Sequence, residues 1–225
     1  PDPDADLRPE GRAGPLVRSR ASYAAYYERW SPPWEAQALL RALPIAGPQE
    51  LRQAFTELID PLRWPADGLD LGAVREARRL KARMEAERLP RGADPTVHTK
   101  LGRGGLSDVE WTVQLLQMEN SGQHPTLRTT GTLDGLQACV DAGLLNGADA
   151  RTLREAWLLA TAIRNAIMLV KARPSDSLPS DMTELSALAA VLRHHGSDGS
   201  QLKDEYLRTT RRARSVTERV FYGEQ

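Results

Sequence analysis

A glycine-rich segment flanked by charged residues is the part of this sequence best suited to chemistry. It reads Lys100-Leu-Gly-Arg-Gly-Gly-Leu-Ser-Asp-Val-Glu110. Gly104 and Gly105 allow backbone conformations that residues with a Cβ avoid, so the segment predicts a tight turn leading into a helix. Ser107, followed by Glu110 three residues later, has the pattern of a capping box. We therefore expect the N–H groups of the turn to be exposed, where they would suit an anion.

A ligand site is one interpretation of this segment, and an ordinary buried helix with a good cap is the other. The helix after the turn has apolar residues on two opposite flanks, with a polar row of Glu110, Gln114 and Gln117 between them. A helix packed on two sides must satisfy such groups with protein partners or with a ligand. The segment is not a Walker A loop, because no Lys-Ser or Lys-Thr follows the glycines at the required spacing.

Other charged residues could act together with this turn. Asp4, Arg8 and Glu10 lie near the start of the sequence, and Asp108 follows the glycines. Carboxylates grouped with cations suit a metal nucleotide, because Mg²⁺ takes oxygen ligands and shares phosphate oxygens with Lys or Arg. The cations between positions 75 and 83 form either a solvated helix face or a face turned to a phosphate.

Several other kinds of site are not supported. The four histidines are not spaced with Cys or acidic residues as a zinc site requires. No Gly-x-Ser-x-Gly elbow is present, and no Gly-x-Gly-x-x-Gly follows a strand. The single Cys139 excludes an internal disulfide, and its apolar helical surroundings predict a buried, inert thiol.

Composition limits the class of protein. The chain has 225 residues, 40% of them hydrophobic, which suffices for a real core in one large or two small domains. No apolar run is long enough to span a membrane, and the first residues do not resemble a signal peptide. Thirty basic residues balance thirty acidic ones, so no global charge favours nucleic acid. We expect a soluble, cytoplasmic protein and, because no Met begins it, a part of something longer.

The elements that position these residues are helices. Proline and glycine punctuation predicts an all-α domain of about eight helices after an extended leading segment, residues 1–18. Aromatic residues between positions 23 and 34 are expected in the core, and Ala73, Ala77, Leu80 and Met84 are expected as a buried stripe. Besides the helix after the turn, the predicted helices are 21–30, 36–42, 48–59, 70–88, 133–142, 148–172, 181–192 and 202–222.

Four segments, in this order, resemble the family of glutamine synthetase adenylyltransferases. These bifunctional enzymes attach AMP to a tyrosine of glutamine synthetase and remove it. The segments are Asp4-Ala-Asp-Leu-Arg-Pro-Glu-Gly-Arg-Ala-Gly-Pro-Leu-Val-Arg18, Ser22-Tyr-Ala-Ala-Tyr-Tyr27, Trp34-Glu-Ala-Gln-Ala-Leu-Leu-Arg41 and Lys100-Leu-Gly-Arg-Gly-Gly-Leu-Ser-Asp-Val-Glu-Trp-Thr-Val-Gln114. Details such as Leu127-Arg-Thr-Thr130 look most like the carboxy-terminal, adenylylating half of actinobacterial members.

The resemblance implies a domain organisation. Each half of such enzymes pairs a polymerase-β-like nucleotidyltransferase domain with a helical domain. Residues 1–18 would be the last strand and loop of the catalytic domain, and residues 19–225 the helical domain, with possible sub-bundles 19–122 and 132–225. Asp4 matches the third metal-binding carboxylate of the family, whereas the Asp-x-Asp pair that supplies the other two is absent. We therefore expect this chain to be inactive alone.

The resemblance also implies site residues. Asp4 and Glu110 are the catalytic candidates, and Asp4 is the candidate ligand of Mg²⁺, which would bind with ATP. Arg8 and the motif residues Lys100, Gly104, Gly105 and Asp108 would lie near the nucleotide or the incoming substrate.

Two alternatives to the adenylyltransferase interpretation stay open. One is a docking module for glutamine synthetase or a PII-type signalling protein, suggested by the aromatic cluster at 23–34 and the basic final helix. The other is the helical domain of a related PII uridylyltransferase, against which Trp34-Glu-Ala-Gln37 favours the adenylyltransferase.

Overall fold

The protein is all-α, as predicted. A computed structural model describes residues 8–30, 33–194, 196 and 198–223, so Asp4 lies outside the described residues. Within these ranges there are nine α-helices and no strand. The helices are α1 (Arg20–Trp30), α2 (Pro33–Leu39), α3 (Gln49–Arg63), α4 (Leu71–Arg88), α5 (Leu106–Asn120), α6 (Thr132–Asp141), α7 (Gly147–Lys171), α8 (Met182–Val191) and α9 (Gly199–Thr217).

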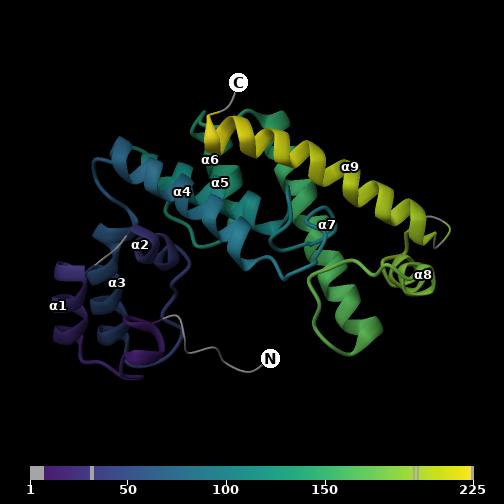
Figure 1. The fold of residues 1–225 in the computed structure, drawn as a ribbon. Coiled ribbons are helices and arrows are strands. Elements are labelled where there is room, and N and C mark those ends of the chain that lie inside the picture. Colours follow the sequence, from purple (N-terminus) through teal and green to yellow (C-terminus); the bar gives the residue numbers. More distant parts are fainter. Residues whose placement is uncertain (1–7, 31–32, 195, 197, 224–225) are drawn as a thin grey trace.

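Helices α5 to α9 form the larger part of the molecule. Figure 1 shows α9 running across α7 and α5, with α8 beside the end of α7. The 25-residue α7 contributes to two of the hydrophobic clusters, one with α5 and α6 and a second with α8 and α9, because small and branched apolar side chains recur along its inner face. Leu153 and Ala156 pack with α5 and α6, whereas Ile163 and Ile167 pack with α8 and α9. Cys139 of α6 is wholly buried in the first cluster.

Helices α1 to α3 form a lobe beside helices α5 to α9, which we call the body (Figure 1). Tyr23 makes ring contacts with Tyr27 and with Phe55 of α3. Among the members of this cluster whose burial is described, only Tyr27 is buried and Trp34 is 46% exposed, so the expectation that the aromatic residues form core is only partly confirmed. The predicted division into sub-bundles stays a prediction.

Helix α4 buries a different face from the one predicted. Val74 and Lys81 are its buried residues, whereas Ala73, Ala77, Leu80 and Met84 are only half-buried. The reason is that Val74 packs against Leu115 of α5 and Phe221 near the carboxyl end. The N-cap prediction is confirmed, because the Asp70 side chain accepts a hydrogen bond from the N–H of Ala73 at 2.7 Å.

Helix α3 is longer than predicted. Helix α3 continues past the predicted stop at Pro61 to Arg63. Arg63 is buried at the end of this helix and donates to the carbonyl of Ala42 at 2.8 Å and to the Asp60 carboxylate at 2.8 Å. Among the described residues, no helix is both long enough and apolar enough to cross a membrane.

Candidate functional site: an open groove beside the glycine-rich turn

The glycine-rich turn uses its own backbone donors. The N–H groups of Leu106 and Ser107 donate to the carbonyls of Thr99 and Lys100 at 2.9 and 3.0 Å, and the N–H of Gly105 donates to Gly102 at 3.0 Å. The prediction that these donors are exposed to an anion is therefore wrong. The physical reason is that the chain folds back on itself, so that carbonyls of the preceding residues reach the start of α5.

The predicted capping box is also absent. Gly105, not Ser107, is the N-cap of α5, and no side chain caps the helix there. Ser107 lies inside the first turn of the helix, where backbone carbonyls already occupy the N–H groups that a cap would serve.

Gly104 is required by the packing of α9 against this turn. Its φ of 71° lies in the left-handed region, and a Cβ there would come within 1.8 Å of the Thr210 carbonyl oxygen of α9. A side chain at this position would therefore push α9 away from the turn. Gly105 is restricted too, because a Cβ would lie 2.6 Å from the carbonyl oxygen of Thr99.

Asp108 lies beneath the turn in a buried charged network. Its side chain is 2% exposed and accepts from the N–H of Gly104 at 2.6 Å and from the guanidinium of Arg214 at 3.2 Å. It also pairs with Lys81, whose side chain has no exposed surface. The cations of α4 were predicted to face solvent or a phosphate. That prediction is wrong for Lys81, which is buried and neutralised by Asp108.

The same network ties the carboxyl end of the chain to α4. Glu85 accepts from Arg214 at 3.2 Å and from the Tyr222 hydroxyl at 3.3 Å, and it pairs with Lys81. Burial would lower the pKa of Arg214, but the neighbouring carboxylates of Asp108, Glu218 and Glu85 raise it overall. This guanidinium therefore stays charged and links α4, α5 and α9.

The polar row of α5 finds protein partners. Glu110 pairs with Arg41 at 2.9 Å, and the amide of Gln37 donates to Gln114 at 2.8 Å. Gln117 donates to the carbonyls of Leu127 and Thr129 at 2.8 and 2.9 Å. The polar row is therefore satisfied by protein partners, one of the two possibilities that the sequence left open. Through these contacts Glu110 and Gln114 attach the lobe of α1 to α3 to the rest of the protein.

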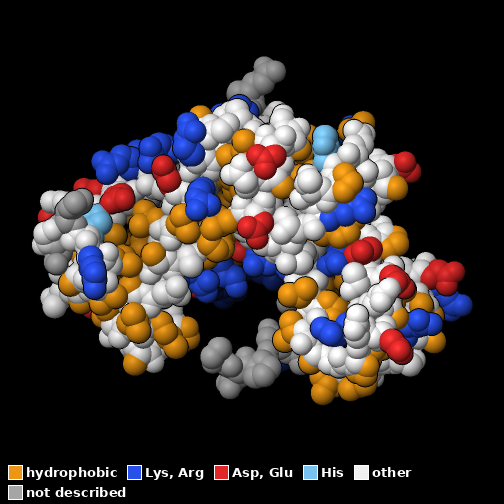
Figure 2. All heavy atoms as spheres, turned by 180° about the vertical axis from the view of Figure 1, so that it is seen from behind, with side chains coloured by type: hydrophobic (Ala, Val, Ile, Leu, Met, Phe, Trp, Pro, Cys, Tyr) orange, Lys and Arg blue, Asp and Glu red, His pale blue; other side chains and the backbone are white. Residues whose placement is uncertain are grey.

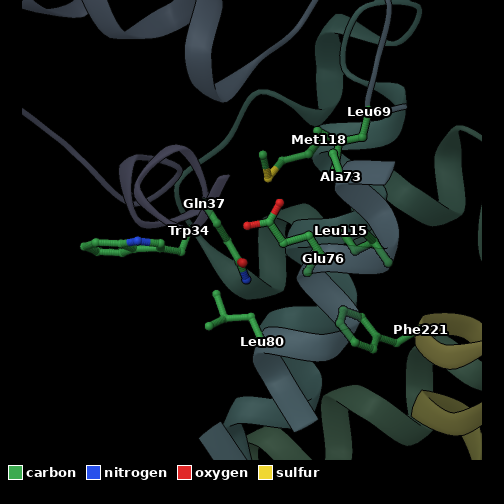
Figure 3. Close-up of a pocket in the computed structure, with 10 residues that line it drawn as sticks. Trp34, Gln37, Leu69, Ala73, Glu76, Leu80, Leu115, Met118 and Phe221 are labelled. Atoms are coloured by element: carbon green, nitrogen blue, oxygen red, sulfur yellow. The ribbon is translucent and has the colours of Figure 1, made fainter. Parts of the chain in front are cut away.

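An open groove of about 900 Å³ lies between this lobe and the body. It is walled by α2, α4, α5 and the loop before the turn, with Asp176 at one side. Figure 2 shows the surface hollowed beside the lobe, with Lys and Arg side chains on the inner wall. Figure 3 shows the side chains around a smaller, mainly apolar pocket. Its volume is about 20 Å³, and it shares Trp34, Gln37 and Leu80 with the groove.

His98 forms part of the groove wall and supports the loop that carries Lys100. Its Nδ1 accepts the N–H of Leu101 at 3.0 Å. Burial lowers the pKa of His98, an effect that the Asp176 carboxylate partly offsets. A neutral imidazole with its proton on Nε2 is consistent with this arrangement.

Two family models match different parts of the chain, and individual relatives match nearly all of it. Residues 2–58 match the model described as glutamate-ammonia ligase adenylyltransferase, and residues 77–221 match the model described as GlnD PII-uridylyltransferase. Over 98% of its length the chain is 62% identical to the bifunctional glutamine synthetase adenylyltransferase/adenylyl-removing enzyme of Streptomyces avermitilis. It is 55% identical, over 97% of its length, to the enzyme of that name from Mycobacterium tuberculosis (strain ATCC 25618 / H37Rv). The chain belongs to the glutamine synthetase adenylyltransferase family.

The chain covers only part of such a protein. It spans about a fifth, 22%, of the length of these two relatives of the glutamine synthetase adenylyltransferase family. The resemblance seen in the four sequence segments is thereby confirmed at the level of the family.

The structure separates the motif residues of the glutamine synthetase adenylyltransferase family into two groups. Lys100 and Glu110 line the groove, whereas Gly104, Gly105 and Asp108 lie in or beneath the turn. Binding of nucleotide or substrate by these residues stays a prediction, and the buried contacts give Asp108 a structural function as well.

The predicted site residue Arg8 lies apart from the groove. It donates to the carbonyl of Gly14 at 3.2 Å in the leading segment, and it is not part of the groove lining.

Two residues that line the groove were not predicted from the sequence. His98 and Asp176 come from positions far apart in the chain, and no local pattern marks them. The described residues contain no group of three or more His, Cys, Asp or Glu side chains able to hold a metal ion. The candidate ligand Asp4 falls outside the described residues, so the Mg²⁺ site stays a prediction.

Proposed function

We propose that this chain is the helical part of the adenylylating half of a glutamine synthetase adenylyltransferase. In the longer enzyme, the tyrosine oxygen of glutamine synthetase attacks the α-phosphorus of ATP, the bond to the β-phosphate oxygen breaks, and pyrophosphate leaves. Mg²⁺, held by carboxylates that include Asp4, would neutralise the phosphate charge. The observation that carries the proposal is the groove, because the family residues Lys100 and Glu110 lie on its wall.

The residues of this chain contribute binding and positioning. Lys100 reaches the groove from a loop whose backbone is held on both sides, and Glu110 lines the same groove from α5. We propose a cytoplasmic protein with ATP as co-substrate and glutamine synthetase as protein partner, without nucleic acid or membrane partners. The chain alone is expected to be inactive, since two of three metal carboxylates of the family are absent from its sequence.

Transfer of labelled AMP from α-labelled ATP to glutamine synthetase tests this proposal. This chain is compared with a longer one that includes the upstream Asp-x-Asp pair of the family. Transfer by the longer chain only, abolished by Asp4→Asn, is the expected result. Transfer by the short chain, or removal of AMP without transfer by the longer one, would contradict the proposal.

A second candidate function follows from the match of residues 77–221 to the uridylyltransferase model. A helical domain of this type could serve transfer of UMP to a PII-type protein, or dock such a protein. The same extended chain, incubated with α-labelled UTP and PII, decides between the two. Labelled PII with unlabelled glutamine synthetase would favour this candidate.

A further inference from the structure

The groove carries positive charge that no described side chain neutralises. Arg83 and Arg88 on α4 and Lys100 on the loop are exposed and line it. Within the described residues, none of the three forms an ion pair or a side-chain hydrogen bond. Unpaired cations on one wall attract an anionic partner.

The carboxylates of the groove are mostly occupied. Glu110 pairs with Arg41 at 2.9 Å, and Asp176 pairs with Arg164 at 2.6 Å. Glu87 is the one lining carboxylate without a partner among the described residues. The described lining residues thus include three unpaired cations and one unpaired carboxylate, which gives this part of the groove an excess of positive charge.

Apolar side chains lie among these cations. Trp34 is 46% exposed at one end, and Leu80, Met84 and Trp111 are half-buried along α4 and α5. Figure 3 shows Trp34 and Gln37 of α2 on the side of the pocket opposite Leu80 of α4. Half-exposed tryptophan and aliphatic side chains bind apolar groups without losing contact with the core.

Lys100 is held in place before any ligand binds. The N–H of Thr99 donates to the carbonyl of Asp176 at 2.6 Å, and the carbonyl of Lys100 accepts from Ser107 at 3.0 Å. The following N–H, of Leu101, donates to His98 at 3.0 Å. The backbone at Lys100 is therefore already ordered, and only the rotamer freedom of its exposed side chain is lost when it pairs with a carboxylate.

We propose that this groove binds an extended, acidic polypeptide segment of the protein substrate. The carboxylates of the segment lie against Arg83, Arg88 and Lys100, and its apolar side chains lie against Trp34 and Trp111. This inference rests on the proposed function, in which a protein receives AMP.

A peptide suits the groove better than a metal nucleotide for two reasons. The groove is open along its length and has a volume of about 900 Å³, near the upper end of what small-molecule pockets reach. A chain of alternating acidic and apolar residues matches both the cations and the apolar wall.

Fluorescence anisotropy with two labelled peptides tests the inference on this chain. One peptide has a tyrosine flanked by alternating Glu and Leu residues, and the other has Lys in place of every Glu. We expect the acidic peptide to bind, the basic one not to bind, and added salt to weaken binding. The double variant Arg83→Glu/Arg88→Glu should weaken binding at least about tenfold, because two attractions become repulsions.

A matched double variant controls for net charge. Arg208 and Arg211 are exposed on α9 and do not line the groove, so Arg208→Glu/Arg211→Glu should leave binding within about twofold. Equal binding of both peptides, equal loss in both double variants, or displacement of the acidic peptide by ATP would each overturn the inference. Circular dichroism of each variant verifies that it is folded.

Activity of the longer enzyme separates this inference from the proposed function. If the unmodified enzyme transfers AMP while Arg83→Glu/Arg88→Glu keeps both KM for glutamine synthetase and kcat, the groove is not the site of the protein substrate. A raised KM for glutamine synthetase with an unchanged KM for ATP supports the inference. If the unmodified enzyme transfers no AMP, the proposed function fails, whatever the peptides do.

Discussion

The carboxylate of Asp108 accepts the backbone N–H of Gly104 at 2.6 Å, four residues before it in the chain. The same carboxylate holds Lys81 of α4 and Arg214 of α9, so one side chain fixes the turn against two other helices. The acidic residue and the glycine of the family motif are thus partners of each other. Their arrangement leaves Lys100 and Glu110 as the motif residues that line the groove.

Asp108→Asn should destabilise the protein by about 3–5 kcal/mol, because it removes one charge of a buried pair and leaves Lys81 poorly compensated. Urea unfolding followed by circular dichroism measures the change. Asp141→Asn is the control, since Asp141 is exposed and, among the described residues, its carboxylate accepts only from Gln137 in its own helix. That variant should stay within about 0.5 kcal/mol of the unmodified protein. Similar losses in both would mean that Asp108 has no special structural function.

Gly104→Ala should cost several times more stability than Gly143→Ala. Both glycines have φ near 70°, but a Cβ at Gly104 meets the Thr210 carbonyl oxygen at 1.8 Å, whereas at Gly143 it meets no atom within 4 Å. Gly143→Ala should therefore show the cost of the left-handed backbone alone, about 1 kcal/mol. Thermal unfolding of the two variants side by side measures the difference, and equal shifts would argue against tight packing of α9 on the turn.

Glu110→Gln and Arg41→Gln separate a substrate contact from a structural one. Each variant breaks the same partly exposed ion pair, so each should lower the free energy of unfolding by less than about 1 kcal/mol. If the Glu110 carboxylate acts on the substrate, Glu110→Gln lowers kcat of the longer enzyme at least about tenfold more than Arg41→Gln does. Equal kinetic effects would show that Glu110 acts only through its pair with Arg41.

Stability should fall as the pH decreases below about 6.5, in part because of His98. Burial lowers the pKa of this imidazole in the folded protein, so the unfolded chain binds more protons in that range. The stabilising contribution is complete above the unfolded pKa and is lost as the pH falls toward the folded pKa. His98→Asn keeps an acceptor for the Leu101 N–H but does not titrate.

Urea unfolding at about pH 7.5 and about pH 5.5 measures this contribution. The unmodified protein should lose more stability between the two pH values than His98→Asn does. The other histidines are common to both proteins and cancel in the comparison. An equal loss in both proteins would rule out His98 as a source of the pH dependence.

The thiol of Cys139 should be unreactive until the protein unfolds. Burial raises its pKa to about 12, and the side chain has no exposed surface. At about pH 8 a thiol reagent should label it only in denaturant, as mass spectrometry would show. Rapid labelling of the folded protein would mean that α6 opens readily.

The helices were predictable because their signals are local. Apolar periodicity and the stops at Gly143 and Pro174 gave α6 and α7 within two residues at each end. The Asp70 cap marked the start of α4. The two apolar flanks of α5 likewise followed from its own spacing, since Val109 and Leu115 are both buried.

The contacts of the charged residues were decided by tertiary structure. The sequence by itself determined an all-α chain with a glycine-rich turn before α5 and a motif that identified the family. It could not show that Lys81 is buried against Asp108, that Thr210 closes over Gly104, or that Arg41 neutralises Glu110. The spacing of residues along a helix fixes which side chains share a face. Which face becomes buried, and which charge meets which, depends on helices that lie far away in the chain.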